Sequence, residues 1–425
     1  MKCFRPHGCP PMLSSGILFT AVCAAFALQS PSYAGITAWL DYTDFDTRLG
    51  ELAATATVTP YTTDEQTLIR ANILSDLQDI YSGFDVSFTE VRPLSGDYER
   101  LVWGLSTTQK GLLGLADSLD LRNLSRNDVS RVYTANFAGF VSEFDGVDQR
   151  DAQLGQLSRT LAGTAAHELA HNLGIEHCDC YACAGISPAN YADTNGWQNN
   201  QISATGGTGL REEGREALRS FSFWERVKLS YAEALLADPP PVLAEQTLVH
   251  DSLATAQNVS LTDLTATDAA SAFITGAISA ANESDYFSFT LLAGQSLTAR
   301  VHSQTLGRSS DRVDSFMSLL APSGEVLFED DNIEYNGNVL NSGLESDRYS
   351  LDTFFVNIPV AQDGTYTLAV RGVGGDTGAY EFVVAVYNQP LSAVVVPETS
   401  TFALGAAGFL LGSGLFWRRR AWRHL

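Results

Sequence analysis

Residues 167–177 read HELAHNLGIEH, and this stretch predicts a helix that ends at a metal site. His167 and His171 stand four positions apart, so on an α-helix they share one face and can present two imidazoles to one ion. Glu168 follows the first histidine directly. Gly174 can adopt the left-handed conformation that ends a helix and turns the chain, which would return His177 as a third ligand.

Three neutral histidines are a ligand set that suits Zn²⁺, and they leave one of its four positions open for water. The ion can lower the pKa of that water to about 7, and Glu168 stands where a general base would act on it. Two histidines at this spacing are common by chance, whereas three histidines, a glutamate and a glycine in register are much more specific. We therefore expect Zn²⁺ as the cofactor and hydrolysis as the reaction.

The complete pattern HExxHxxGxxH resembles the signature of the metzincin zinc metallopeptidases. The resemblance implies that the three histidines bind zinc, that Glu168 is the general base and proton shuttle, and that the site lies in an α+β catalytic domain. Metzincins also have a methionine in a tight turn beneath the metal, but the only methionine after the motif is the distant Met317. Residues 201–206 are similar to that turn, with Ser203 in the place of the methionine.

Three cysteines follow the motif, at Cys178, Cys180 and Cys183. A histidine followed by a cysteine, with another cysteine five residues later, is similar to the archaemetzincin branch, which uses such cysteines in an additional zinc site. That branch also needs a CxxC pair further downstream, and no cysteine follows Cys183, so this resemblance is partial and the second zinc site is not carried over to this chain. An odd number of cysteines in an oxidising compartment indicates one local disulfide with one free thiol, or an intermolecular bond. The expected pair is Cys178 with Cys183.

The first 34 residues are typical of a secretory signal peptide. Basic residues precede an apolar run from Leu13 to Leu28, and Ser32, Tyr33 and Ala34 complete a cleavage site. The apolar run is short for a transmembrane anchor. We therefore expect an exported protein that is cleaved after Ala34.

Residues 391–425 predict a sorting tail. Val396-Pro397-Glu398 opens it, an apolar transmembrane segment runs from Phe402 to Trp417, and four arginines close it. The tail resembles a PEP-CTERM signal, with Thr399 in place of the second proline. The resemblance implies an exosortase-type processing enzyme as a partner, and a protein held at the membrane before release to the cell surface or extracellular matrix. A plain single-pass anchor is the alternative.

The charge of the chain limits its partners. The formal net charge is −23, and the two ends contribute more basic than acidic residues, so the exported part is still more negative. Such a charge repels nucleic-acid phosphate and anionic membrane and favours solubility. Nucleic acid is therefore not an expected partner.

Residues 35–238 have the element order expected of a metzincin-like catalytic domain. Gly114 to Asp120 is expected to be a loop, with an ion-binding loop as the alternative. The predicted elements are a strand at 36–40, a helix that begins with a capping box at Thr63 to Gln66, strands at 84–89, 100–105 and 131–137, a long helix at 151–173 and a closing helix at 212–236.

Consecutive prolines after Asp238 predict a linker at 239–246, and residues 247–390 read as an all-β sandwich of jelly-roll type. The pieces ESDYFSF at 283–289 and DGTYTL at 363–368 resemble the bacterial pre-peptidase C-terminal domain of secreted peptidases. Eight strands are predicted, at 273–278, 285–291, 296–301, 315–320, 326–329, 354–358, 364–371 and 379–386.

Acidic and amide side chains gather in one predicted loop of this domain, at Glu329, Asp330, Asp331, Asn332 and Glu334. Clustered oxygen ligands of this kind could hold Ca²⁺. A solvated acidic turn is the commoner outcome.

These patterns together predict an exported zinc metalloendopeptidase that hydrolyses peptide bonds in a protein or peptide substrate. One alternative is a surface or extracellular-matrix binding protein with a vestigial zinc site, which the altered methionine turn permits. Glu168 argues against it, because a structural zinc site has a closed ligand set and needs no base. A zinc hydrolase that acts on a non-peptide bond is the other alternative.

Overall fold

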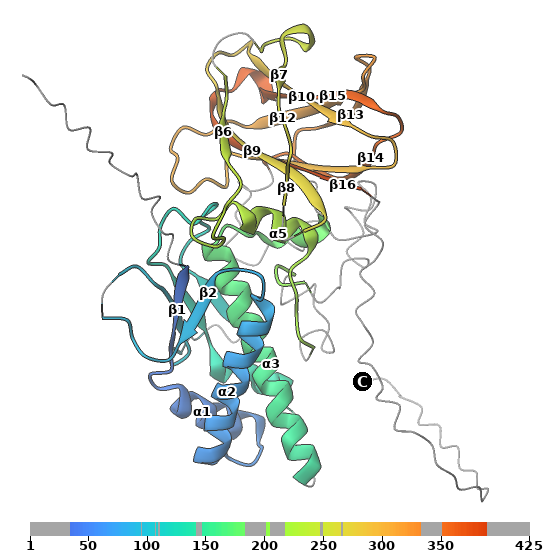
Figure 1. Ribbon diagram of the computed structural model, residues 1–425. Coiled ribbons are helices and arrows are strands. Elements are labelled where there is room, and N and C mark those ends of the chain that lie inside the picture. Colours follow the sequence, from blue (N-terminus) through green and yellow to red (C-terminus); the bar gives the residue numbers. More distant parts are fainter. Residues whose placement is uncertain are drawn as a thin grey trace, which may run out of the picture.

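The computed structural model describes residues 35–94, 96–106, 108, 111–141, 147–182, 201–204, 217–246, 250–264, 267–332 and 351–388. They form an N-terminal domain of helices around one sheet and a C-terminal domain of strands, with the short helix α5 (Phe223–Ser230) between the two (Figure 1). The expected signal peptide, the sorting tail with its apolar segment, Cys183 and Glu334 lie outside the described residues. Among the described helices, none has the length and apolar character needed to cross a bilayer.

The N-terminal sheet has five strands in the order β2-β1-β3-β5-β4. Strands β2, β1, β3 and β5 are parallel to one another, and β4 pairs antiparallel with β5. Because β4 comes last in the order, it is an edge strand. The strands predicted at 36–40, 84–89 and 100–105 are confirmed with small shifts. The bounds are β1 Ile36–Asp41, β2 Val86–Thr89, β3 Glu99–Val102, β4 Gly114–Ala116 and β5 Val129–Val132.

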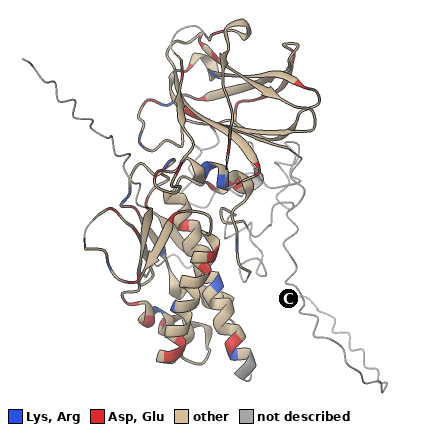
Figure 2. Ribbon diagram, viewed as in Figure 1, with Lys and Arg blue, Asp and Glu red and all other residues tan. Residues whose placement is uncertain are grey.

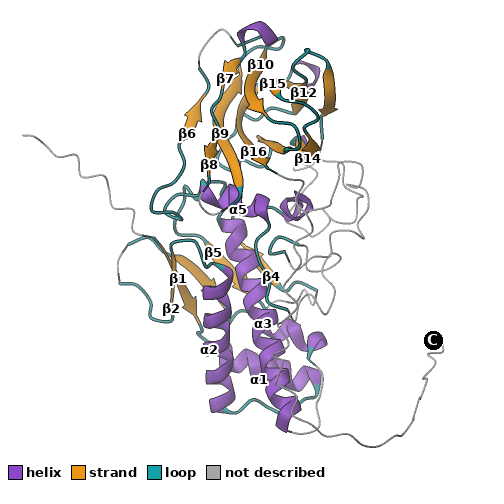
Figure 3. Cartoon of the chain, turned by 45° about the vertical axis from the view of Figure 1, so that its right-hand side comes forward, coloured by secondary structure: helices purple, strands orange, loops and turns teal. Residues whose placement is uncertain are grey.

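Two long helices, α2 (Thr63–Ile80) and α3 (Val147–Asn172), pack side by side against the sheet (Figure 3). The apolar stripe predicted for the long helix is buried, since each of its members is at most 4% exposed: Leu154, Leu157, Leu161, Ala165 and Leu169. This stripe faces the core of the N-terminal domain. The C-terminal end of α3, with His167 and His171, lies toward the boundary with the C-terminal domain (Figure 1).

The structure corrects three predicted elements of this domain and adds one. The capping box of α2 begins at Thr62, one residue earlier than predicted, because Glu65 and not Gln66 bonds back to the cap. Helix α1 (Phe45–Ala56) was not predicted at all. The loop expected at Gly114 to Asp120 begins with strand β4, and the strand expected at 131–137 ends at Val132 and continues as the 3-10 helix η1 (Thr134–Phe140).

The closing helix is much shorter than predicted. Ser222 caps α5 and forms a capping box with Glu225, so the helix starts there and not at residue 212. It ends at Ser230, and Tyr231 follows as its C-cap. Apolar spacing continues on both sides of α5, but the capped start at Ser222 and this end set its true length.

The C-terminal domain is a sandwich of two sheets, with strand orders β13-β12-β15-β10-β7 and β14-β11-β16-β9-β6, and this confirms the predicted β-sandwich. All eight predicted strands are present. Val242–Ala244, inside the expected linker, pairs with the sheet as β6. The bounds are β6 Val242–Ala244, β7 Gln257–Asn258, β8 Thr262–Asp263, β9 Ala269–Ile278, β10 Ser284–Leu291, β11 Ser296–His302, β12 Ser315–Leu320, β13 Val326–Asp330, β14 Phe354–Pro359, β15 Gly364–Gly372 and β16 Gly378–Tyr387.

The two domains share a hydrophobic cluster at their boundary. Trp224 and Tyr231 from the N-terminal side pack against Phe354 and Phe273 of the sandwich, with ring centroids 5.5 and 5.1 Å apart. Basic residues of α5 lie between the domains as well (Figure 2). The boundary therefore combines an apolar core with charged side chains.

Candidate metal centre

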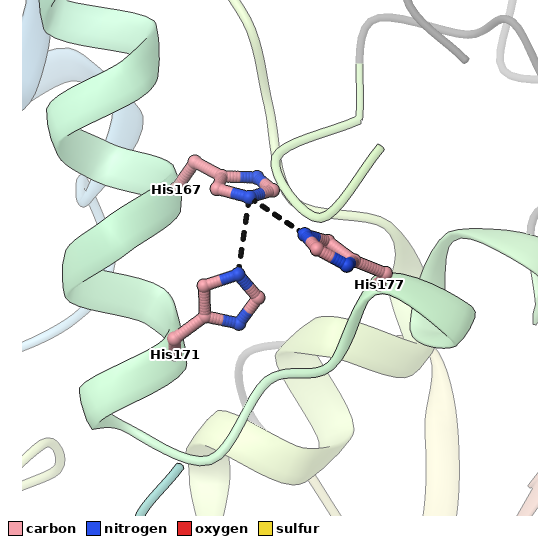
Figure 4. A group of neighbouring side chains, drawn as sticks. All are labelled: His167, His171 and His177. Atoms are coloured by element: carbon pink, nitrogen blue, oxygen red, sulfur yellow. Dashed lines mark hydrogen bonds between the residues drawn. The ribbon is translucent and has the colours of Figure 1, made fainter. Parts of the chain in front are cut away.

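Three histidines converge at the end of α3 (Figure 4). The Nε2 atom of His167 lies 3.0 Å from Nε2 of His171 and 3.0 Å from Nε2 of His177. The three side chains belong to residues that are 4–7% exposed, and they form a group that could hold a metal ion. The structure thus brings together all three histidines that the motif predicted as ligands.

Gly174 makes the turn that returns His177. Its φ is +90°, and a Cβ at this position would overlap the backbone of Leu121. The amide of Gly174 donates to the carbonyl of His171 at 2.9 Å, which closes the end of the helix. The glycine is therefore required both for its left-handed backbone and for the close approach of the neighbouring chain.

Backbone carbonyls orient two of the imidazoles. Nδ1 of His167 lies 2.6 Å from the carbonyl oxygen of Ile202, and Nδ1 of His171 lies 2.7 Å from that of Ile175. Since a carbonyl only accepts, Nδ1 donates in both cases, and each Nε2 keeps a lone pair directed at the common centre. Burial lowers the pKa of His167 well below its usual value, and the two neighbouring histidines add to this effect. A neutral imidazole whose Nε2 carries a lone pair is the form that a metal needs.

The geometry fits zinc. Tetrahedral zinc with Zn–N bonds of about 2.0 Å would place its nitrogen ligands about 3.3 Å apart. The Nε2–Nε2 separations of 3.0 Å from His167 to the other two histidines need only a small outward adjustment of the rings. Carbonyl acceptors behind Nδ1 are also the usual outer partners of metal-bound histidines.

Glu168 lies beside this centre in a nearly closed environment. Glu168 is 5% exposed, and its Oε2 has no hydrogen-bond partner among the described residues. Burial raises the pKa of Glu168 to about 8. Strand β4 passes directly against it, since a Cβ on Gly114 would overlap the carboxylate. A buried carboxylate with an open oxygen is the arrangement expected of a general base.

The turn expected to replace the methionine turn lies under His167. Residues 201–204 are described, and Ile202 supplies the carbonyl that orients the imidazole. Ser203 is 1% exposed, and its amide donates to Oε1 of Glu225 at 2.7 Å. A backbone hydrogen bond from Ser203 to a buried glutamate thus holds the turn at the position where metzincins have their methionine.

Arg219 is a residue of the site that the sequence did not reveal. Its guanidinium donates to the carbonyls of Gln201, Ile202 and Ala204 and to Gly163 of α3. The residue is 4% exposed. Its only sequence signal was a cation inside an apolar segment that we expected to be helical. The structure shows instead that it ties the turn to helix α3.

A cavity of about 250 Å³ opens in the N-terminal domain, and Tyr133 is one of the residues that line it. Burial raises the pKa of Tyr133, and the charge of Glu168 contributes, which places the phenol near Glu168. The lining residues are Glu51, Thr55, Leu105, Ser106, Tyr133, Ala135 and Asn136. The volume is enough for one side chain of a substrate.

The remaining predicted sites are only partly described. Cys178 and Cys180 are buried directly after His177, and because Cys183 lies outside the described residues the disulfide stays a prediction. Asp330 ends β13, and its carboxylate accepts from the amide of Asn332 at 3.2 Å. Asp331 follows in the same turn. The calcium site also stays a prediction.

Residues 283–372 match the family model of the bacterial pre-peptidase C-terminal domain. This match confirms the resemblance of the sandwich to that family. Among solved structures, the chain is similar to the periplasmic inhibitor of g-type lysozyme PliG from Aeromonas hydrophila, with 14% identity, 31% of this chain and 94% of that chain covered, and a TM-score of 0.20. It is also similar to the pre-peptidase C-terminal domain of collagenase from Bacillus anthracis, with 15% identity, coverage of 35% and 99%, and a TM-score of 0.20. Comparison with curated proteins gives no match.

Proposed function

We propose that this chain is an exported zinc metalloendopeptidase of the metzincin type. The observation that carries the proposal is the convergence of three buried histidines, whose Nε2 atoms lie close together, beside the buried carboxylate of Glu168. When bound, zinc supplies a Lewis acid that polarises the scissile carbonyl and stabilises the oxyanion. The histidines would hold it from the end of α3 and the turn that follows.

Glu168 acts as the proton carrier of the reaction. A carboxylate oxygen accepts a proton from the attacking water as the water oxygen bonds to the carbonyl carbon. The same oxygen then gives that proton to the amine nitrogen as the C–N bond breaks. The open Oε2 of Glu168 makes this transfer feasible without first breaking a bond to another described group.

Strand β4 supports a peptide as the substrate. It is the last strand of the sheet, and its backbone passes against Glu168 at Gly114. An extended peptide could pair with this edge through main-chain hydrogen bonds, which would place a scissile bond near the carboxylate. The cavity beside Tyr133 would then receive one of its side chains.

Export is part of the proposal. The signal-like N-terminus and the sorting-like tail point to it, and the domain family matched at residues 283–372 is named for bacterial pre-peptidases. The acidic charge of the chain agrees with a protein that stays soluble outside the cell.

The test is cleavage of an unstructured protein, such as denatured casein, by residues 35–397 loaded with zinc. Glu168→Gln keeps the shape of the side chain and removes its basicity, so we expect bound zinc to stay and cleavage to fall about 10²- to 10⁴-fold. The exposed Glu90, changed to glutamine in the same way, is the matched control and should cleave as the wild type does.

Two results would contradict the proposal. If Glu168→Gln with full zinc content cleaves as fast as the wild type, Glu168 is not the base. If the wild type binds zinc and cleaves no member of a broad peptide pool, the binding-protein alternative becomes the better explanation.

A further inference from the structure

The short segment from Glu176 to Asp179 contains His177 and is enclosed by charged side chains from two other parts of the chain. Glu176 and Asp179 are 1% and 0% exposed, and so are their partners Lys228 of α5 and Arg300 of β11, at 1% and 0%. Two acids and two bases are therefore buried together. Since an unpaired buried charge is very costly, all four must be arranged around one another.

Arg300 reaches this segment from the C-terminal sandwich. Its Nη2 lies 2.7 Å from Oε2 of Glu176, and its Nη1 lies 3.3 Å from Oδ1 of Asp179. The same Nη1 also contacts the sulfur of Cys178. The ring of Phe354, on the neighbouring strand β14, supports the guanidinium at 5.1 Å. One planar side chain thus contacts the residues on both sides of His177.

Helix α5 holds the segment from the other direction. Nζ of Lys228 lies 2.6 Å from Oδ2 of Asp179 and 3.3 Å from Oε2 of Glu176. Nε1 of Trp224 donates to Oδ1 of Asp179 at 2.8 Å. Within the segment, the amide of Glu176 donates to Oδ2 of Asp179 at 2.7 Å. The Asp179 carboxylate is therefore fixed by donors from its own turn, from α5 and from β11.

We propose that the C-terminal domain is a structural part of the metal centre, and that Arg300 is the positioning residue through which it acts. By holding Glu176 and Asp179, Arg300 fixes the short turn that presents His177 to the ion. The inference rests on the proposed zinc site. In this proposal the C-terminal sandwich helps to form the zinc site, because its Arg300 holds the turn that carries the third ligand, His177.

The proposal has a reciprocal consequence. If contacts with β11 favour the conformation that binds zinc, then zinc must favour the contacts with β11 by the same factor. The coupling can therefore be measured from either side, by zinc affinity in variants or by the protection of β11 in the wild type.

The first experiment measures zinc affinity of the full chain by competition with a chromophoric chelator. We expect Arg300→Met to bind zinc at least tenfold more weakly, as for the loss of an outer partner of a metal ligand. Arg300→Lys, which keeps a cation but not the planar fork, should recover part of the affinity. Excess zinc should restore the peptidase activity of both variants, which a general loss of folding would not allow.

The matched control is Arg371→Met. Arg371 belongs to β15 in the other sheet of the same domain and packs over Phe316. It should bind zinc as the wild type does. Folded Arg300→Met with wild-type zinc affinity would overturn the proposal.

The second experiment needs no variant and remains decisive if Arg300→Met does not fold. Hydrogen exchange of the wild-type chain is compared with and without zinc. We expect zinc to slow exchange in β11, around Arg300, more than in β15 of the other sheet. Equal effects of zinc on both strands would overturn the proposal.

These readouts separate the inference from the proposed function. Zinc binding that is coupled to β11 without any peptide cleavage would refute the peptidase and leave the positioning role in place. Zinc binding without coupling would refute the positioning role alone. Absence of zinc binding in the wild type would refute both.

Discussion

His167 and Arg219 meet at one carbonyl oxygen, that of Ile202. Nδ1 of His167 lies 2.6 Å from this oxygen and Nη2 of Arg219 lies 2.5 Å from it. One lone pair of the carbonyl orients the imidazole and the other accepts from the guanidinium. The turn at 201–204 is therefore coupled to the metal centre through a single peptide group.

This relationship predicts the effect of Arg219→Met. The change leaves several buried carbonyls without a donor, so we expect the free energy of unfolding to fall by about 2–5 kcal/mol. Zinc affinity should fall about 10- to 100-fold, because the carbonyl behind His167 is no longer held. Urea unfolding and chelator competition measure the two effects.

The control is Arg126→Met, which removes a partly exposed pair with Glu233 and should cost less than about 1 kcal/mol. Unchanged zinc affinity in Arg219→Met would show that the turn does not position the ligand.

A second prediction concerns the glycine of the motif. Gly174→Ala must place a side chain at φ +90° and against Leu121. Gly294→Ala meets the same left-handed strain at φ +88° but has nothing within 4 Å of the new Cβ. The control should cost about 1 kcal/mol, and Gly174→Ala clearly more. Thermal unfolding of both variants gives the comparison, and equal costs would mean that the turn has room to relax.

A third prediction uses the pH dependence of stability. Glu99 is 1% exposed, neither of its carboxylate oxygens has a hydrogen-bond partner within the described chain, and burial raises its pKa to about 9. The ordinary pKa of an unfolded glutamate is about 4.3. Between these values the folded chain binds a proton that the unfolded chain releases, so stability falls as the pH rises, by up to about 1.4 kcal/mol per pH unit.

Glu99→Gln should remove this dependence. The stability advantage of the variant over the wild type should therefore grow between pH 5 and pH 8, as measured by urea unfolding at several pH values. Glu65→Gln should instead lower the stability, because the hydrogen bonds from Arg150 lower the pKa of Glu65 to about 2 in the folded chain. This loss of stability should disappear as the pH falls toward 2. An advantage of Glu99→Gln that does not change with pH would mean that Glu99 is ionised in the fold.

Much of the site could be predicted because its signals are local in the sequence. The ligand spacing of the motif follows from helical geometry, and Gly174 marks the end of the helix by its backbone requirement alone. The eight strands were predicted by alternation and turn residues within short windows. These features need no knowledge of the rest of the chain.

The parts that could not be predicted depend on distant contacts. Arg219 and Arg300 act on segments to which no local pattern connects them. Helix α1 was missed although Asp44 is a residue type favoured at the N-cap, and in the structure its side chain makes no cap hydrogen bond. The closing helix was predicted too long because apolar spacing does not reveal where tertiary contacts replace helical ones.

The last prediction concerns the boundary between the domains. Trp224 is fully buried there, packs against Phe354 and donates to Asp179, so it contacts both the sandwich and the segment with His177. Because this cluster is shared, we expect the two domains of the wild type to unfold in one transition. Tryptophan fluorescence follows the N-terminal domain and far-ultraviolet circular dichroism follows the whole chain, so the two curves should coincide in urea. Trp224→Ala should cost about 3–5 kcal/mol and separate the curves. Trp39→Ala, which removes a half-buried ring of β1 that contacts Tyr98 and Arg100 of the N-terminal domain, should lower stability without separating them. Two separate transitions in the wild type would show that the domains are energetically independent, whatever their contacts.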